Sequence, residues 1–261
     1  MSEPVKPAAL PSVKDLASSE ASVRRTCLSN ILTYLDDRNP STPLTPIECL
    51  QLWRGFYVAL YMHDSKNALS VQRLIADLAG TVRTMEQKDQ QLAHAANAQS
   101  PSWLDTWATA FWETICREWA SIDQWRMNKV LLLIRFVIRE HFGLALGWVV
   151  NEDPNLKDQV ANQLRVFEAW PLSPRERKVP DGLRLHVLDV WVEELAGQLS
   201  VAQKVLDDAE NSNTESKKNV LLNLAQEFME PVRKVSREGL SKGVKIRAKE
   251  AVKLAEEQLS G

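Results

Sequence analysis

The chain has 261 residues, of which 44% are hydrophobic and 25% are charged. This composition is that of an ordinary globular protein and excludes a collagen-like, low-complexity or wholly disordered chain. Its 32 Lys and Arg against 34 Asp and Glu give a net charge of −2. The balance argues against a generic, salt-driven nucleic-acid binder, so any contact with nucleic acid must be local.

Three cysteines without a Cys-x-x-Cys pair exclude a disulfide framework and a cysteine zinc site, and favour a reducing compartment. The first twelve residues lack the apolar core of a signal peptide. No apolar run reaches the ~20 residues that a membrane span requires. We therefore expect a soluble intracellular protein that has no membrane partner.

Only 9 glycines, together with apolar residues that recur at intervals of three and four, predict an all-α protein. Thr45-Pro46-Ile47-Glu48 is a strong helix start, because Thr caps, Pro needs no N–H at the first helical position and Glu reaches back. The expected helices, in chain order, are about 20–35, 46–62, 68–85, 102–119, 125–146, 154–167, 182–199 and 217–229, followed by a basic segment to residue 259. Residues 85–100 are polar and alanine-rich, and fit either a helix extension or a surface loop.

Short connections between these helices imply antiparallel neighbours. Hairpins of about forty residues without a readable repeat consensus predict a HEAT-like, irregular solenoid arrangement, with a compact irregular bundle as the alternative. We expect five segments: a flexible N-terminus at 1–15, a helical core domain at 16–170, a Pro-rich basic connector at 171–180, a helical continuation of the same domain at 181–229 and a basic C-terminal helical segment at 230–261.

Two segments concentrate positive charge in this near-neutral chain. The connector, which we expect to be extended and on the surface, contains the run Arg175-Glu176-Arg177-Lys178 between prolines. Between residues 233 and 253, eight Lys and Arg stand against two Glu, a surplus of six. This surplus favours contact with RNA phosphates over a merely solvated helix face.

The sequence does not place acidic residues or histidines in a pattern that is typical of a catalytic site. Glu113, Glu118 and Asp123 are candidates for acid/base chemistry, but Glu113 is spaced to pair with Arg117, and Asp123 suits the first turn of a helix. The four histidines are scattered, and the common nucleotide and hydrolase motifs are absent from the sequence. We expect no catalytic residue, metal, cofactor or small-molecule substrate, and hence a protein that is not an enzyme.

Tryptophan is unusually frequent, with 9 of the 18 aromatic residues. The helix at 102–119 carries two aromatic stripes, one with Trp103, Trp107 and Phe111 and the other with Trp112 and Trp119. Such a helix is either enclosed between two layers or offers an aromatic face to a partner. Each buried indole N–H also needs a hydrogen-bond acceptor.

Three stretches together resemble the eukaryotic nucleolar ribosomal RNA-processing protein 1 family. They are Leu52-Trp53-Arg54-Gly55 with the turn Met62-His63-Asp64-Ser65-Lys66, residues 111–135, and residues 180–195. The resemblance covers residues 16–199, and it implies an all-helical, non-enzymatic assembly factor of the large (60S) ribosomal subunit in the nucleolus. Such a protein acts in pre-rRNA processing, bound to precursor particles with other assembly factors and ribosomal proteins.

Exposure logic and charge then give two sets of candidate contact residues. The predicted partner-binding residues are Trp53, Arg54, Trp112, Arg117, Trp119, Arg126, Lys129 and Arg135. The predicted RNA-binding residues are Arg175, Arg177, Lys178, Lys242, Lys245 and Arg247. The alternatives are a helical-repeat adaptor that binds protein only, and an all-α hydrolase or nuclease, which would require clustered carboxylates or histidines in one pocket.

Overall fold

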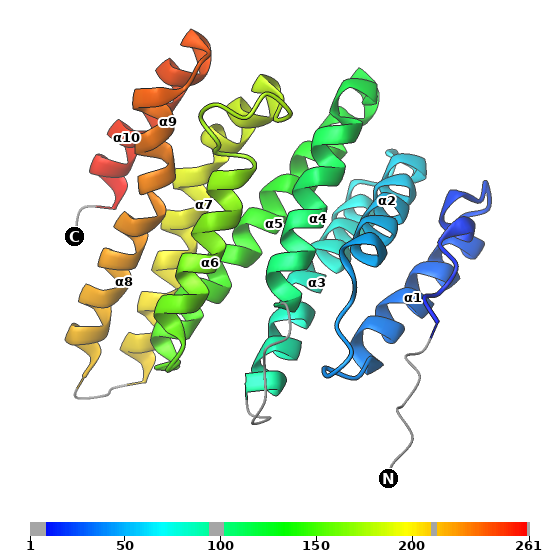
Figure 1. Cartoon of the computed structure of the whole chain (residues 1–261), viewed down its shortest axis with the longest axis horizontal. Helices are drawn as coiled ribbons and strands as arrows, with labels where there is room; N and C mark the ends of the chain where they lie inside the picture. Colours follow the sequence, from blue (N-terminus) through cyan, green and yellow to red (C-terminus); the bar gives the residue numbers. More distant parts are fainter. Residues whose placement is uncertain (1–8, 94–101, 210–212, 260–261) are drawn as a thin grey trace. The chain divides into compact units, whose positions relative to one another are not determined.

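The structure is a computed structural model that describes residues 9–93, 102–209 and 213–259 (Figure 1). These residues form helices and turns, and no strand occurs among them. The helices are η1 (Lys14–Ala17), α1 (Ala21–Asp37), α2 (Pro46–Met62), α3 (Ala68–Ala93), α4 (Trp103–Glu118), η2 (Trp119–Ser121), α5 (Gln124–Val150), α6 (Leu156–Ala169), α7 (Asp181–Asp208), α8 (Thr214–Phe228), α9 (Glu230–Glu238) and α10 (Lys242–Gln258). The all-α prediction is confirmed.

The segment left open at 85–100 is helical as far as Ala93, where α3 ends. Residues 94–101 lie outside the described residues, as do residues 1–8 of the N-terminus that we expect to be flexible, residues 210–212 of the acidic stretch and the last two residues, 260–261. Helix α7 runs on to Asp208, well beyond the predicted end at 199. Between α8 and α9 the break falls at Met229, and Pro231 stands in the first turn of α9.

Two helix starts show how the sequence determines these boundaries. At α2 the capping box forms as predicted: the Glu48 amide donates to Thr45 Oγ1 over 3.2 Å, and the Thr45 amide donates to Glu48 Oε2 over 2.7 Å. At α4 the cap has two parts: Ser102 Oγ accepts from the Asp105 amide over 3.1 Å, and Asp89 of α3 accepts from the amides of Trp103 (2.8 Å) and Leu104 (3.0 Å). Both arrangements satisfy backbone donors that have no partner within the helix itself.

The chain divides into two compact units. Unit 1 comprises residues 1–114 and 124–130, and unit 2 comprises residues 115–123 and 131–261. Within each unit, short connections make most successive helices antiparallel, in the irregular, solenoid-like packing of helical hairpins that the sequence predicts (Figure 1). The connector at 171–180 belongs to unit 2, and the domain limits expected from composition stay a prediction.

The core of unit 1 is aromatic. The Trp53 ring lies 5.0 Å from the Trp107 ring and 4.8 Å from the Phe111 ring, measured between centroids. Both indoles have acceptors, since Trp53 Nε1 donates to the Trp107 carbonyl over 3.1 Å and Trp107 Nε1 donates to Thr81 Oγ1 over 3.0 Å. The large apolar area is thus removed from water without leaving the N–H groups unpaired.

Unit 2 has a second aromatic core around Trp191 of α7. Phe142 and Phe167 contact this indole edge-on, with centroids 4.8 Å and 5.0 Å away, and Trp191 Nε1 donates to the Phe228 carbonyl over 3.1 Å. One side chain thereby connects α5, α6, α7 and α8.

The aromatic residues of both stripes that lie within α4 are buried, whereas Trp119 lies in η2 and is half-buried. Trp107 and Trp112 are 0% exposed, and Trp103, Phe111 and Ile115 are at most 2% exposed. α4 is therefore enclosed by other parts of the chain and does not offer an aromatic face to a partner. Its tryptophans are core residues.

Candidate functional site

A groove in unit 2 brings together two segments that are far apart in sequence. The Leu240 amide, between α9 and α10, donates to the Pro174 carbonyl of the connector over 3.3 Å. Arg175 Nε lies 3.9 Å from Glu238 Oε2 at the end of α9. The two segments enclose a groove of about 400 Å³, hereafter the connector groove. Its lining residues are Pro174, Arg175, Glu176, Arg177, Val179, Pro180, Asp181, Arg184, Leu240, Ser241 and Val244.

The connector groove lies between the two segments that carry the predicted RNA-binding cations, and Glu176 and Asp181 also line it. Arg175 and Arg177 line it from the connector, and both are exposed. Ser241 and Val244 line it from α10, which places Lys242 at the same helix start. Ser241 makes no side-chain cap, so the first amides of α10 are left for another acceptor at the positive end of the helix dipole.

The remaining predicted RNA-binding residues differ in their exposure and in whether an acidic side chain neutralises their charge. Lys178 is exposed, and Lys245 is half-buried, with its Cγ 3.2 Å from the position that a Cβ on Gly239 would take. Arg247 donates to Asp189 Oδ1 of α7 over 2.6 Å and lies 3.2 Å from Glu250 Oε2. Its charge is therefore neutralised within the chain, which makes it the weakest member of the set.

Arg184 of α7 anchors the connector through hydrogen bonds to its backbone. Its guanidinium donates to the carbonyls of Ser173, Glu176 and Val179, and its Nη1 lies 3.1 Å from Asp181 Oδ1. The residue is 6% exposed. The connector consequently forms consecutive turns, where the sequence led us to expect an extended segment. No local pattern in the sequence marks Arg184 as the anchor of the connector, although it lies in the third recognisable stretch.

Three residues predicted to bind partners are buried in unit 1. Trp53 is 1% exposed, Trp112 is 0% exposed and Lys129 is 6% exposed. This corrects their assignment to a docking surface, because a side chain without exposed area presents nothing to a partner.

Lys129 instead closes the carboxyl end of α2. Its Nζ donates to the carbonyls of Tyr61 (3.2 Å) and His63 (2.8 Å). One turn earlier, Arg126 donates to the Tyr61 carbonyl over 3.1 Å and stacks on the Tyr61 ring at 4.3 Å. Two cations thus meet the negative end of the α2 dipole, so the first two recognisable stretches of sequence hold each other in place.

In unit 2, Trp119 and Arg135 also make contacts within the chain. A Cβ placed on Gly182 would lie 3.1 Å from Trp119 Cζ2, so this glycine admits the indole. Arg135 forms ion pairs with Glu193, at 2.7 Å, and with Glu194. Arg139 adds a second guanidinium to Glu194, 2.6 Å away, and the two arginines lower the pKa of this carboxyl despite its burial. The second and third recognisable stretches meet here.

Arg54 and Arg117 are the two predicted partner-binding residues that are exposed. The structure adds Trp125, which is 80% exposed and was not among the predicted contact residues. It stands in the first turn of α5, directly after Gln124. That position was a usable signal, because side chains in a first turn often extend beyond the packed part of a helix.

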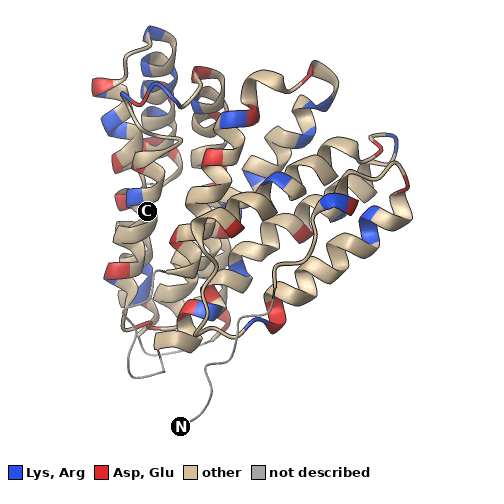
Figure 2. Ribbon diagram, turned by 45° about the vertical axis from the view of Figure 1, so that its right-hand side comes forward, with Lys and Arg blue, Asp and Glu red and all other residues tan. Residues whose placement is uncertain are grey.

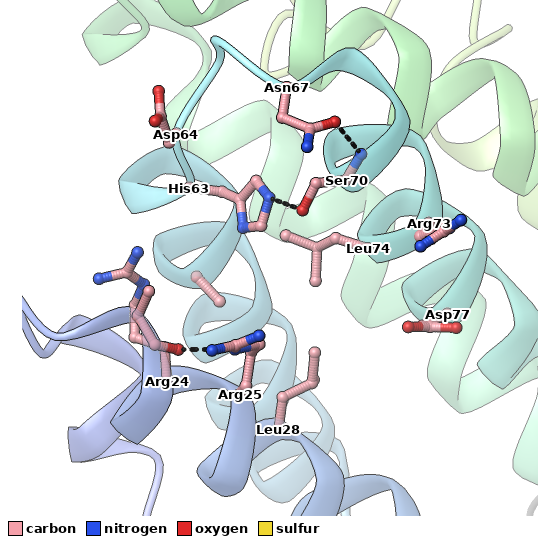
Figure 3. A pocket seen from close by; sticks show the side chains of 12 residues that line it. Arg24, Arg25, Leu28, His63, Asp64, Asn67, Ser70, Arg73, Leu74 and Asp77 are labelled. Atoms are coloured by element: carbon pink, nitrogen blue, oxygen red, sulfur yellow. Dashed lines mark hydrogen bonds between the residues drawn. The ribbon is translucent and has the colours of Figure 1, made fainter.

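Unit 1 contains a pocket of about 480 Å³ between α1, the end of α2 and α3, hereafter the α1–α3 pocket (Figure 3). Its lining residues are Ala21, Arg24, Arg25, Leu28, Ala59, His63, Asp64, Asn67, Ser70, Arg73, Leu74 and Asp77. His63 and Leu74 lie at its centre, and His63 Nε2 is 3.0 Å from Ser70 Oγ. The wall around His63 is the Met62–Lys66 turn, part of the first recognisable stretch.

Positive and negative side chains are interspersed along the helices, in keeping with the net charge of −2 (Figure 2). Among the described residues, no group of three or more His, Cys, Asp or Glu is placed to hold a metal ion. In the same part of the chain, no helix combines the length and the apolar character needed to cross a bilayer.

The fold and these surfaces define an all-α protein built from stacked helical hairpins, with charges of both signs along its helices. The chain belongs to the family described as nucleolar protein Nop52, which its residues 8–260 match.

Three relatives show how far this similarity extends. The mouse protein named ribosomal RNA processing protein 1 homolog B is 30% identical over 182 residues, which are 69% of this chain and 22% of the relative. The human homolog B is 28% identical over 200 residues, 75% of this chain and 23% of the relative. The Drosophila melanogaster homolog is 30% identical over 169 residues, 62% of this chain and 21% of the relative. The chain thus spans less than a quarter of the length of these relatives.

Proposed function

We propose that the chain is a non-enzymatic assembly factor of the large (60S) ribosomal subunit, acting in the nucleolus as a helical scaffold needed for pre-rRNA processing. Its family is described as nucleolar, and its relatives are named for ribosomal RNA processing. Its partners in this role are other assembly factors and ribosomal proteins of precursor particles, together with pre-rRNA.

The connector groove is the observation that carries the RNA contact. Arg175 and Arg177 line the groove from the connector, and Lys242 follows the lining residue Ser241 at the start of α10, which has no side-chain cap. Guanidinium groups and helix N-termini are both suited to phosphate oxygens. Because the chain as a whole is slightly acidic, this contact positions the protein on RNA and is not a general affinity for polyanions.

Contacts with other assembly factors fall to exposed side chains. Arg54, Arg117 and Trp125 are exposed, and an indole or guanidinium at the centre of an interface is a frequent source of binding energy. The tryptophans of the two cores contribute indirectly, by keeping these helix surfaces rigid.

Purification of the tagged chain from cells tests this function. We expect pre-rRNA of the large subunit and its assembly factors to copurify with the chain. Treatment with ribonuclease before elution separates the two kinds of contact, since factors bound through protein surfaces remain. Recovery of neither pre-rRNA nor large-subunit factors would contradict the proposal. Recovery of protein partners without any pre-rRNA would favour the adaptor that binds protein only.

A further inference from the structure

We infer that the α1–α3 pocket binds an acidic segment of a partner protein, which inserts one aliphatic side chain and places a carboxylate against the arginines of the rim. This inference goes beyond the proposed function. The pocket belongs to unit 1 alone and shares no residue with the connector groove.

The floor of the pocket is apolar. Leu28, Ala59 and Leu74 line it and are each less than 9% exposed. A volume of about 480 Å³ lies within the range of ligand pockets in proteins. An aliphatic side chain entering it would exchange water for these three residues.

The rim supplies positive charge that the chain itself does not neutralise. Arg25 and Arg73 are exposed, and neither has a carboxylate partner among the described residues. Arg24 is fixed in the wall, where its guanidinium donates to the carbonyls of Ser18 (2.7 Å) and Ser19 (3.0 Å). Figure 3 shows Arg25 on one side of Leu74 and Arg73 on the other. A carboxylate above Leu74 would therefore meet guanidinium donors from both α1 and α3.

Burial disfavours a charge of either sign inside the pocket, and it raises the pKa of Asp77. The pKa of His63 is lowered, first by burial and then by the positive charges of Lys129 and Arg24, which outweigh Asp64. The interior thus disfavours a further cation. Lys129 contributes here because it caps the turn that carries His63.

Two features favour a protein segment over RNA as the occupant. Asp64 and Asp77 also line the pocket, and they oppose a run of successive phosphates more strongly than a segment that brings a single carboxylate to the arginines. The lining contains no Phe, Tyr or Trp on which a base could stack. An aliphatic floor suits a leucine, isoleucine or methionine side chain.

A random dodecapeptide library selected on the purified full chain tests the inference. We expect the enriched peptides to combine Asp or Glu with Leu, Ile or Met. The affinity of the best peptide, measured by fluorescence anisotropy, should fall at least tenfold in the double variant Arg25→Glu/Arg73→Glu. Ala21→Trp, which fills the mouth from an exposed position of α1 without changing charge, should weaken the same peptide.

The matched control is Lys14→Glu/Arg83→Glu, which makes the same change of net charge at exposed positions of unit 1 outside the pocket. It should retain the affinity of the wild-type chain, and circular dichroism should show all variants folded. Three outcomes would overturn the inference: no enrichment above a bare support, enriched peptides whose binding the pocket variants leave unchanged, or displacement of the peptide by a single-stranded RNA oligonucleotide that itself depends on Arg25 and Arg73.

Discussion

The conformation of the connector groove depends on Arg184, and replacing this residue with methionine tests that dependence. Methionine keeps an apolar stem of similar length and removes every donor. Three connector carbonyls and the Asp181 carboxylate then lose their partner. A hydrogen bond from a charged donor contributes about 1.5–3 kcal/mol, but the turns lie near the surface and water replaces part of what is lost. We expect a net cost of about 2–4 kcal/mol in the free energy of unfolding.

Hydrogen exchange measures where this cost falls. The amides of Ser173, Val179 and Leu240 donate to the carbonyls of Trp170, Glu176 and Pro174 respectively, so they report on the connector and its attachment. If the connector opens locally, a loss of about 2 kcal/mol raises the exchange rates of these amides about 30-fold.

Two variants serve as controls for Arg184→Met. Arg177→Met changes an exposed residue of the same connector and should alter stability by less than about 0.5 kcal/mol. Arg184→Lys keeps the charge but cannot reproduce the planar fork, and should give an intermediate effect. Unchanged exchange at all three amides in a folded Arg184→Met variant would refute the role of Arg184 as the anchor of the connector.

Three further predictions concern stability, each measured by urea unfolding. Burial lowers the pKa of His141 from 6.5 to about 4, so the unfolded chain binds more protons between these values, and stability falls as pH decreases from 6.5 towards 4. His141 alone should lower the free energy of unfolding by about 2 kcal/mol between pH 7 and pH 5. The variant His141→Leu lacks this contribution, so its stability should fall by about 2 kcal/mol less over the same range; equal pH dependence in both proteins would contradict this. Asp89→Ala removes the acceptor of the Trp103 and Leu104 amides of α4, while Ser102 Oγ still accepts from the Asp105 amide, and should cost about 1–2 kcal/mol, with Asp89→Asn restoring part of the loss; stability equal to that of the wild type would contradict this role of Asp89. Gly55→Ala would place a Cβ 3.0 Å from Val13 Cβ and should lower stability by about 1–3 kcal/mol. The control is Gly80→Ala, which should be neutral or stabilising because its Cβ meets only the Arg83 guanidinium, at 3.4 Å. The reverse order of stability would contradict the packing of η1 on α2.

Local signals in the sequence were sufficient for much of the fold. The predicted start at Pro46 is the observed one, because every part of the capping box is within four residues. Helix α7 was predicted too short. Its last two turns carry no cap or break before Asp208, so the sequence has no signal for an end at residue 199. At the start of α4, Ser102 provides a local cap, but Asp89 belongs to another helix, so only the structure could show its part of the cap.

The candidate sites were harder to predict, for two physical reasons. Trp53 and Arg54 are neighbours in sequence, and both were predicted to lie on one partner-binding surface. Successive residues of a helix point about 100° apart, so Trp53 enters the core while Arg54 faces outward. The connector groove required a tertiary contact between Pro174 and Leu240, and no local pattern reports on such a pairing. Composition did identify the two basic segments that meet there.

The contact of the connector groove with RNA is the central claim, and crosslinking tests it most directly. Lys242→Glu/Lys245→Glu combined with Arg175→Glu/Arg177→Glu reverses the charge of the groove at residues that are exposed or half-buried. We expect crosslinking of the tagged chain to pre-rRNA in cells to fall at least tenfold, while the protein stays folded and copurifies with the same assembly factors. The double variant Lys14→Glu/Arg83→Glu controls for exposed charge outside the groove. Undiminished crosslinking of the groove variant to pre-rRNA would contradict the account.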